Sequence, residues 1–283
     1  MATMKAMLQY LYLGRVGYDE GLRIQAEVAA LVGESRAQNV LLLLEHPPVL
    51  TLGRNANRAN ILASGELLRR RGVTIHEINR GGDVTYHGPG QLVGYPIFDL
   101  RRLPGPNGGR MGPVDFVRLM EEALIRLCGG FGVRAGRIKG LTGVWCAARG
   151  GPLDESGGKE RKIGAIGIHV SRGITTHGFA FNVTTHLDDF SLIIPCGIAD
   201  HAVTSLEQEI GSGENLDLEP VAHHAARLFG QVFGQQVLAV ENLAALRAQS
   251  LEAQPGFPAE DTPLRVPAQV ERLVGTPERP IRA

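Results

Sequence analysis

Residues 40–44 (VLLLL) restrict the possible folds of this chain more than any other segment, because all five residues are apolar. A short strand with no polar side suits the middle of a sheet that is covered on both faces. The run leads into Glu45-His46-Pro47-Pro48, and the two prolines cannot continue regular strand pairing. Because a membrane-spanning helix needs about 20 apolar residues, the run predicts a buried strand instead.

Helical and extended patterns alternate on both sides of this strand. Helices are predicted for residues 18–36, 64–71, 113–128, 203–210 and 220–233. Strands are predicted for residues 7–13, 49–52, 73–78, 91–98, 162–170, 173–183 and 237–240. Neighbouring short strands favour a mixed sheet over a purely parallel one, within an α/β (α+β) fold. We expect one domain over residues 1–248 and, over residues 249–283, a C-terminal tail without regular structure.

The charge balance argues against a nucleic-acid or membrane partner, because 29 Lys and Arg residues equal 29 Asp and Glu residues. The local cluster Arg69-Arg70-Arg71 suits either a solvated face or contact with an acidic protein. No apolar run approaches a membrane span, and the first 13 residues lack the continuous apolar stretch of a signal peptide. We therefore expect a cytoplasmic protein.

The cysteines and histidines do not form a metal-binding pattern. Cys128, Cys146 and Cys196 are odd in number and far apart, which fits neither a disulfide framework nor a CxxC pair. The nine histidines are scattered, and no HExxH motif occurs. The chain also lacks a GxGxxG motif after a strand and a phosphate-binding P-loop. We therefore expect no metal site and find no nucleotide-binding motif.

Residues 80–91 (RGGDVTYHGPGQ) form the first segment that exceeds what packing needs, because its glycines are interrupted by Arg, Tyr and His. Such a backbone can approach a ligand closely while its side chains contact the same ligand. An elaborate hairpin loop would have a similar composition, so both interpretations stay open on composition alone.

Residues 161–168 (RKIGAIGI) form the second segment, in which Lys162 begins an otherwise apolar strand. Removing a lysine from water disfavours the ammonium and can make the amine a base. Gly164 and Gly167 leave one face of the strand bare, which suits a flat or linear ligand. The alternative is a lysine that extends its amine to water from a strand end.

Residues 193–198 (IIPCGI) form the third segment, in which Cys196 lies in a tight bend between Pro195 and Gly197. A thiol there can be exposed and reactive, whereas Cys128 lies on the apolar face of a predicted helix. Cys146 follows Trp145 in an apolar strand and is expected in the core. The alternative for Cys196 is a small buried hydrophobic residue.

Together these segments resemble the octanoyltransferase family, also called lipoate-protein ligase B. The matching segments follow in the family's order: residues 80–91, 162–168, 177–182 (HGFAFN) and 195–198. The resemblance implies the fold of biotin and lipoate protein ligases, a mixed sheet flanked by helices. It also implies that neither ATP nor a metal is needed, because the incoming acyl group is already a thioester.

The resemblance also implies a two-step acyl transfer. The octanoyl group arrives on the phosphopantetheine of acyl carrier protein, Cys196 holds it as a thioester, and Lys162 activates the thiol as a base. A lysine of a lipoyl domain then accepts the group; the implied acceptors are the lipoyl domains of 2-oxoacid dehydrogenase complexes and the glycine cleavage H protein.

The resemblance also implies which residues line the acyl site, and their bare backbone and apolar side chains suit an alkyl chain. Three histidines are candidate contacts to the thioester or its carbonyl, and His87 ranks first because it lies inside the glycine-rich segment. The expected substrate-binding residues are Arg80, Gly81, Gly82, Asp83, Val84, Thr85, Tyr86, His87, Ala165, Ile166, Gly167, Gly178, Phe179, Ala180, His46 and His177.

Three other functions compete with this interpretation. An ATP-dependent lipoate or biotin ligase shares the fold, but its lysine serves an adenylate and it needs no cysteine. A hydrolase would pair Cys196 with His177 or His87 and release free octanoate. A non-catalytic scaffold would bind acyl carrier protein without turnover.

Overall fold

The computed structural model describes residues 6–147, 160–195, 201–211 and 216–252 of the 283-residue chain. Within these residues, nine strands form one sheet in the order β12-β1-β2-β6-β10-β9-β8-β7, with β11 paired to β9. Three further strands form a small second sheet in the order β4-β3-β5. Among the described helices, none has the length and hydropathy that crossing a bilayer requires.

The large sheet mixes parallel and antiparallel pairs, as predicted. Its strands are β1 (Met7–Arg15), β2 (Asn39–Glu45), β6 (Gln91–Ile97), β7 (Ala135–Ile138), β8 (Leu141–Cys146), β9 (Arg161–Ser171), β10 (Ile174–Asn182), β11 (Ala202–Val203) and β12 (Gln236–Ala239). Strand β1 pairs in parallel with β12 and β2, and β11 pairs in parallel with β9, whereas the other neighbours are antiparallel.

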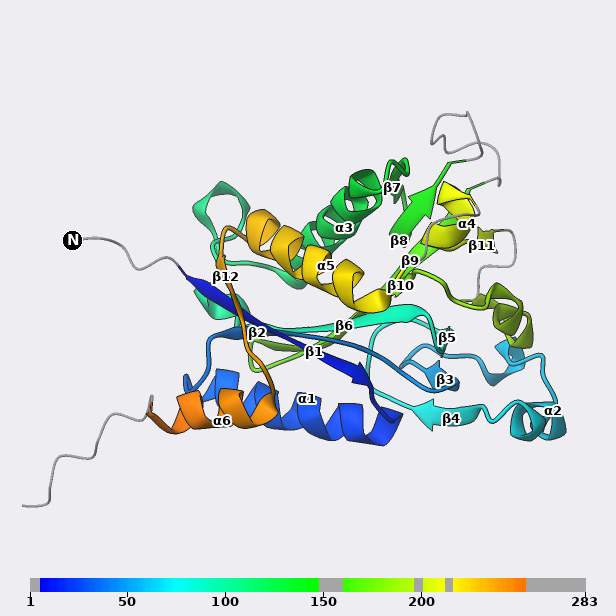
Figure 1. The fold of residues 1–283 in the computed structure, drawn as a ribbon, viewed down its shortest axis with the longest axis horizontal. Helices are drawn as coiled ribbons and strands as arrows, with labels where there is room; N and C mark the ends of the chain where they lie inside the picture. The colour runs from blue at the N-terminus through cyan, green and yellow to red at the C-terminus, as the bar shows by residue number, and fades with distance from the viewer. Residues whose placement is uncertain (1–5, 148–159, 196–200, 212–215, 253–283) are drawn as a thin grey trace, which may run out of the picture.

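Helices cover both faces of this sheet (Figure 1). Helices α3 (Pro113–Gly130) and α5 (Leu218–Phe233) lie on one face, and α1 (Tyr18–Gly33) and α6 (Leu243–Glu252) lie on the other. The packing of strand β2 shows why residues 40–44 are all apolar. Leu41 and Leu43 belong to the core that contains α3 and α5 residues, whereas Leu42 and Leu44 belong to the core that contains α1 residues. The predicted covered central strand is therefore confirmed.

The small sheet stands beside the large one and carries the glycine-rich segment. It contains β3 (Val49–Leu52), β4 (Thr74–Glu77) and β5 (Val84–His87) and lies next to the short helix α2 (Gly65–Arg70) (Figure 1). Strand β5 pairs antiparallel with β3. The segment is therefore part of a second sheet and not a hairpin loop between two neighbouring strands.

The prediction of a helix over residues 203–210 was wrong at its start. Ala202 and Val203 instead pair with β9, and Thr204 N donates a hydrogen bond to Lys162 O at 2.9 Å. Helix α4 (Leu206–Ile210) begins only after Ser205, whose Oγ accepts from Gln208 N as an N-cap.

The boundary expected at residue 248 also falls inside a helix. Helix α6 continues to Glu252, Ser250 is buried, and Gln249 Oε1 accepts from Gln9 Nε2 at 2.7 Å. The apolar residues of α6 do not gather on one side of the helix, so its sequence carried no periodic signal for a helix. Residues 253–283 lie outside the described part of the chain.

Candidate acyl-binding site

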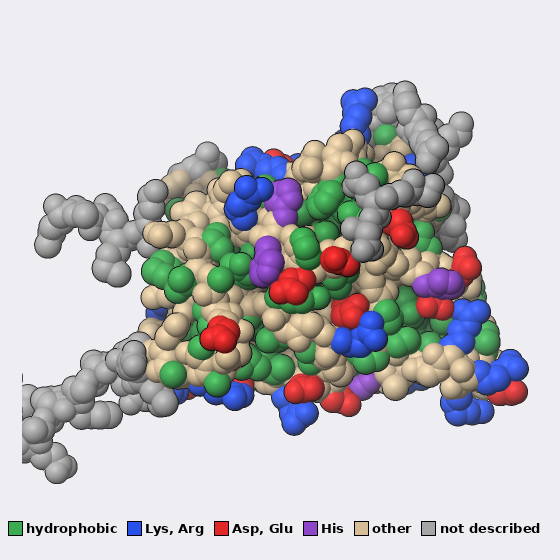
Figure 2. Space-filling view, in the orientation of Figure 1, with side chains coloured by type: hydrophobic (Ala, Val, Ile, Leu, Met, Phe, Trp, Pro, Cys, Tyr) green, Lys and Arg blue, Asp and Glu red, His purple; other side chains and the backbone are tan. Residues whose placement is uncertain are grey.

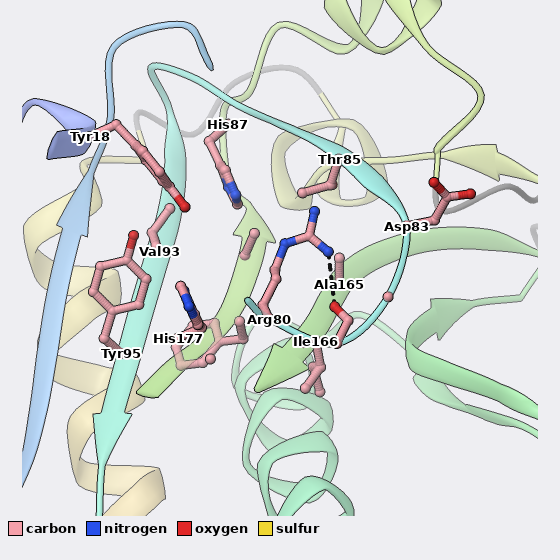
Figure 3. A pocket seen from close by; sticks show the side chains of 16 residues that line it. Tyr18, Arg80, Asp83, Thr85, His87, Val93, Tyr95, Ala165, Ile166 and His177 are labelled. Carbon is pink, nitrogen blue, oxygen red and sulfur yellow. Dashed lines mark hydrogen bonds between the residues drawn. The ribbon is translucent and has the colours of Figure 1, made fainter. Parts of the chain in front are cut away.

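A cavity lies between the small sheet and strands β6, β9 and β10 of the large one. Its lining combines the glycine-rich segment with the middle of β9 and β10 (Figure 3). The lining residues are Tyr18, Arg80, Gly81, Gly82, Asp83, Thr85, His87, Val93, Tyr95, Ala165, Ile166, Gly167, His177, Gly178, Phe179 and Ala180. The structure therefore brings most of the expected substrate-binding residues to one place.

Strand β5 divides its residues between two sides because successive side chains point to opposite faces of a strand. Thr85 and His87 line the cavity, whereas Val84 and Tyr86 are buried in a separate small core. Tyr86 donates its hydroxyl to Asp189 Oδ2 at 2.7 Å. Val84 and Tyr86, expected to bind substrate, are thus placed behind the cavity wall.

Arg80 is held in the wall by backbone and side-chain acceptors. Its guanidinium donates to Thr51 O at 2.7 Å, to Thr51 Oγ1 at 2.9 Å and to Gly81 O at 3.0 Å. Gly81 N donates to Ile168 O at 3.0 Å, which fixes the segment against β9. A Cβ on Gly167 would lie 2.7 Å from Gly81 O, so this close approach requires glycine.

His87 and His177 line the cavity as neutral rings. Burial lowers the pKa of His87 to about 3 and that of His177 to about 4. His87 Nδ1 lies 2.8 Å from Gln91 Oε1, and His177 Nε2 lies 2.7 Å from Asn79 Oδ1. Because amide oxygens only accept, these two ring nitrogens carry the protons and donate.

His46 does not line the cavity but supports a residue that does. Its side chain is fully buried, and burial lowers its pKa to about 4. Nδ1 donates to Val16 O at 2.6 Å, so Nε2 accepts from the Tyr95 hydroxyl at 2.6 Å. His46 therefore fixes Tyr95, and the structure gives it no direct contact with the cavity.

Tyr18, Val93 and Tyr95 line the cavity but were missed from the sequence. Figure 3 shows Tyr18 and Tyr95 at one side and Asp83 at the other, with the Arg80 side chain extending between them. The site is consequently more polar than the bare backbone and apolar side chains expected. Tyr18 is the first residue of α1 and Tyr95 belongs to β6. In the sequence, neither tyrosine differs from a residue that simply packs in a helix or strand.

Lys162 lines a smaller cavity that shares Thr85, Ala165 and Ala180 with the larger one. The lysine is buried, with 8% of its surface exposed, and its Nζ lies 4.6 Å from the centre of the Trp145 ring. Among the residues that the structure describes, no carboxylate forms an ion pair with this amine. The remaining lining residues are Gln91, Ile163, Asn182, Phe190, Pro195 and Val203.

Cys196 lies outside the described residues, but the segment that leads to it is anchored. Ile194 N donates to Asn60 O at 2.7 Å, and Ile193 forms a β-bridge with Ile61. Pro195, which precedes Cys196 in the sequence, lines the Lys162 cavity. The chain therefore approaches Cys196 from the edge of this cavity.

The other two cysteines are buried thiols, as predicted. Burial raises the pKa of Cys128 well above its usual value and that of Cys146 to about 12. Both thiols therefore stay protonated at neutral pH, and neither is suited to attack an acyl group.

Solved structures that resemble this chain in fold include lipoate protein ligases. A bi-partite lipoate protein ligase from Thermoplasma acidophilum gives a TM-score of 0.62 at 16% identity, covering 87% of this chain and 91% of the other. The similarity confirms the predicted fold, a mixed sheet flanked by helices in the arrangement of lipoate ligases.

Sequence comparison identifies the family. Residues 17–230 match the family model of the lipoyl protein ligase A/B catalytic domain. The octanoyltransferase of Acidobacterium capsulatum is 58% identical over 83% of this chain and 94% of its own length. That of Koribacter versatilis is 48% identical over 94% of this chain and 97% of its own. The chain therefore belongs to the octanoyltransferase family of acyltransferases, built on the lipoyl protein ligase A/B catalytic domain.

Proposed function

We propose that this protein moves an octanoyl group from acyl carrier protein to a lysine of a lipoyl domain through a thioester on Cys196. The acceptors are the lipoyl domains of 2-oxoacid dehydrogenase complexes and the glycine cleavage H protein, and the reaction takes place in the cytoplasm. The names of the curated relatives support octanoyl transfer. The neighbouring Thermoplasma acidophilum ligase belongs to a lipoylation system with an E2 lipoyl domain, which supports this class of acceptor.

One observation carries the proposal: the cavity that Lys162 lines is bordered by Pro195 and shares Thr85, Ala165 and Ala180 with the larger cavity. An acyl chain in the larger cavity would extend past Ala165 and Ala180 toward Lys162 and the chain segment before Cys196. A buried amine without a carboxylate partner among the described residues suits a base.

The first step forms the acyl-enzyme. Lys162 accepts the proton of the Cys196 thiol, and the thiolate attacks the octanoyl thioester carbonyl of the carrier. The bond between the carbonyl carbon and the carrier sulfur breaks. The departing thiolate takes a proton from the Lys162 ammonium and leaves as the free carrier thiol.

The second step transfers the acyl group to nitrogen. A neutral lysine amine of the lipoyl domain attacks the octanoyl-Cys196 carbonyl, and its proton passes to Lys162. The carbon–sulfur bond breaks, and Cys196 regains its proton from Lys162. Conversion of a thioester to an amide is downhill, which is why the proposal requires neither ATP nor a metal.

Trp145 gives the ammonium a partner during both steps. An aromatic face attracts a cation within about 6 Å of its centre, and Lys162 Nζ lies 4.6 Å from that of Trp145. The ring therefore contributes an attraction for the ammonium that forms when Lys162 accepts a proton in the proposed steps.

The decisive test is intact-protein mass spectrometry after mixing the enzyme with octanoyl-acyl carrier protein, without ATP or acceptor. We expect an octanoyl adduct that hydroxylamine removes, that is absent from Cys196→Ser, and that a lipoyl domain discharges. Transfer without an adduct would instead favour direct attack. Transfer only with ATP and free octanoate would indicate a ligase, and release of octanoate without acceptor would indicate a hydrolase.

A further inference from the structure

One face of the neighbouring strands β6, β10 and β9 carries residues of both cavities, two positions apart along each strand. The register of the strands places these residues in rows that cross the sheet. We call the rows near (Gln91, Asn182), middle (Val93, Ala180, Ala165) and far (Tyr95, Gly178, Gly167). The near row lines the Lys162 cavity, the far row lines the larger cavity, and the middle row contributes Ala165 and Ala180 to both. The rows therefore lead from Lys162 to Tyr95.

The three rows contain no charged side chain. The visible surface is different, because Figure 2 shows Lys, Arg, Asp and Glu side chains spread over it. Uncharged rows suit an alkyl chain that lies along the strands.

The spacing of the rows can be compared with the length of an acyl chain. Strand residues advance about 3.3 Å each, so the far row is about 13 Å from the near row. An extended chain of single bonds advances about 1.2 Å per bond, as the protein backbone does. An octanoyl group whose carbonyl lies at the near row would extend about 8 Å and end between the middle and far rows. A dodecanoyl group would extend about 13 Å and meet the far row.

Tyr95 supplies the side chain of the far row, since the other two members are glycines. Figure 3 shows Tyr95 on the side of the cavity opposite Thr85 and Ala165, which border the Lys162 cavity. The Tyr95 hydroxyl donates to His46 Nε2 at 2.6 Å, and His46 does not line the cavity. The carbon ring is therefore the part of Tyr95 that an acyl chain would meet.

The ring of Tyr95 is held from behind. A Cβ on Gly21 would lie 2.9 Å from His46 Cε1 and 3.8 Å from Tyr95 Cε2, so α1 packs directly against both side chains. His46 is fixed in turn by Val16 O, which accepts from Nδ1 at 2.6 Å. Because a closely packed interior leaves little free space, the ring cannot move away from a longer chain without disturbing α1.

We propose that Tyr95 sets the upper limit of acyl-chain length, because the methyl end of the chain stops against its ring. His46 is the positioning residue that holds this ring in place. The inference rests on the proposed function and deepens it, since it assigns the choice of chain length to one side chain. An apolar pocket discriminates by roughly 10- to 200-fold per methylene, so a mixture of donors reveals the limit.

The test offers the enzyme equal amounts of acyl carrier protein loaded with hexanoyl, octanoyl, decanoyl, dodecanoyl or tetradecanoyl groups, with a lipoyl domain as acceptor. Mass spectrometry of the lipoyl domain shows which chains are transferred. For Tyr95→Val we expect the ratio of dodecanoyl to octanoyl product to rise at least about tenfold. Both products form in one sample, so the ratio does not depend on how much of the variant is folded. An unchanged ratio would overturn the inference.

Two further variants separate the ring from its hydrogen bond. Tyr95→Phe keeps a ring packed by His46 and should keep the ratio close to that of the wild type. His46→Ala frees the ring and should raise the ratio, though less than Tyr95→Val does. A purely structural role of His46 would lower all products equally and leave the ratio unchanged. If Tyr95→Phe raises the ratio as much as Tyr95→Val, the ring is not the stop and the inference fails.

Val93→Ala is the matched control, because it shortens a residue of the same strand and face one row nearer to Lys162. It should reduce transfer of octanoyl without raising the share of dodecanoyl, since the far row is intact. A rise equal to that of Tyr95→Val would show that any truncation in the wall relaxes chain length, and would contradict the inference. If the wild-type enzyme transfers no acyl group from any carrier, the proposed function itself is wrong, which separates the two failures.

Discussion

The two neighbouring cavities differ in the partners of their polar side chains. In the larger cavity, Arg80, His87 and His177 are each hydrogen-bonded to protein acceptors, and both histidines are neutral. In the smaller one, the only described partner of the Lys162 amine is the Trp145 ring. Groups that are fully hydrogen-bonded hold their shape, whereas the Lys162 amine has an aromatic face beside it. In the proposed mechanism, the larger cavity binds the acyl group and the smaller one contains the reacting amine.

Removing the amine tests this division most directly. Lys162→Met should slow formation of the octanoyl adduct by about 10²- to 10⁴-fold, because a positioned general base contributes that much. Rapid-quench mass spectrometry measures the rate, and the folding of the variant is checked by circular dichroism. An unchanged rate would show that the thiol is activated by another group.

Adding a side-chain atom to the wall of the larger cavity should destabilise the folded protein as well as obstruct the cavity. A Cβ on Gly178 would overlap Gly94 O and Pro96, whereas one on Gly164 would meet its nearest neighbour at 3.4 Å. Gly178→Ala is therefore expected to lower the free energy of unfolding by about 3 kcal/mol. Urea denaturation measures the change, and Gly164→Ala is the matched control. Equal losses in both variants would mean that the wall yields easily.

Because the buried histidines are neutral in the folded protein, the free energy of unfolding should decrease as the pH is lowered. His46, His87 and His177 have pKa values of about 4, 3 and 4 in the folded protein, below about 6.5 for an unfolded histidine. The unfolded state therefore binds more protons between these values. Each histidine should cost about 1.4 kcal/mol of unfolding free energy per unit as pH falls from about 6.5 to about 4.

Urea titrations at several pH values measure this slope. His46→Gln should reduce the slope, because a buried ring whose pKa is lowered is then absent. A slope that His46→Gln leaves unchanged would show that this ring is not buried in its neutral form.

Of these changes, removing the aromatic ring beside Lys162 should have the smallest effect on the rate of adduct formation. Trp145→Leu is expected to slow adduct formation by roughly 2- to 30-fold, since a cation–π contact contributes about 0.5–2 kcal/mol. Trp145→Phe keeps an aromatic face and should lose less. If both variants lose the same activity, the ring acts through packing alone.

Much of the fold could be predicted because burial leaves a periodic pattern in the sequence. The all-apolar residues 40–44 indicated a covered strand, and the helix beginning at Pro113 followed its apolar spacing. Strand β11 was missed because two residues are too few to show a period. Helix α6 was missed because its faces differ little in polarity.

The site was predicted unevenly for a related reason. Residues of the glycine-rich segment and of β9 stood out by their unusual composition, whereas those of β10 were expected from the resemblance to the octanoyltransferase family. Tyr18 and Tyr95 look like packing residues, and only the tertiary fold shows that they reach the cavity. The opposite error concerns Val84 and Tyr86, which the alternation of β5 directs into a separate core.

The pairing of β12 with β1 has a consequence for how the chain is made. Met7–Tyr10 is among the first described segments to be synthesised, yet its partner, Gln236–Ala239, is among the last. Until that partner emerges from the ribosome, the outer backbone of β1 is an open sheet edge, and open edges promote aggregation. A nascent chain from which Gln236–Ala239 has not yet emerged should therefore depend on chaperones more than the finished enzyme does.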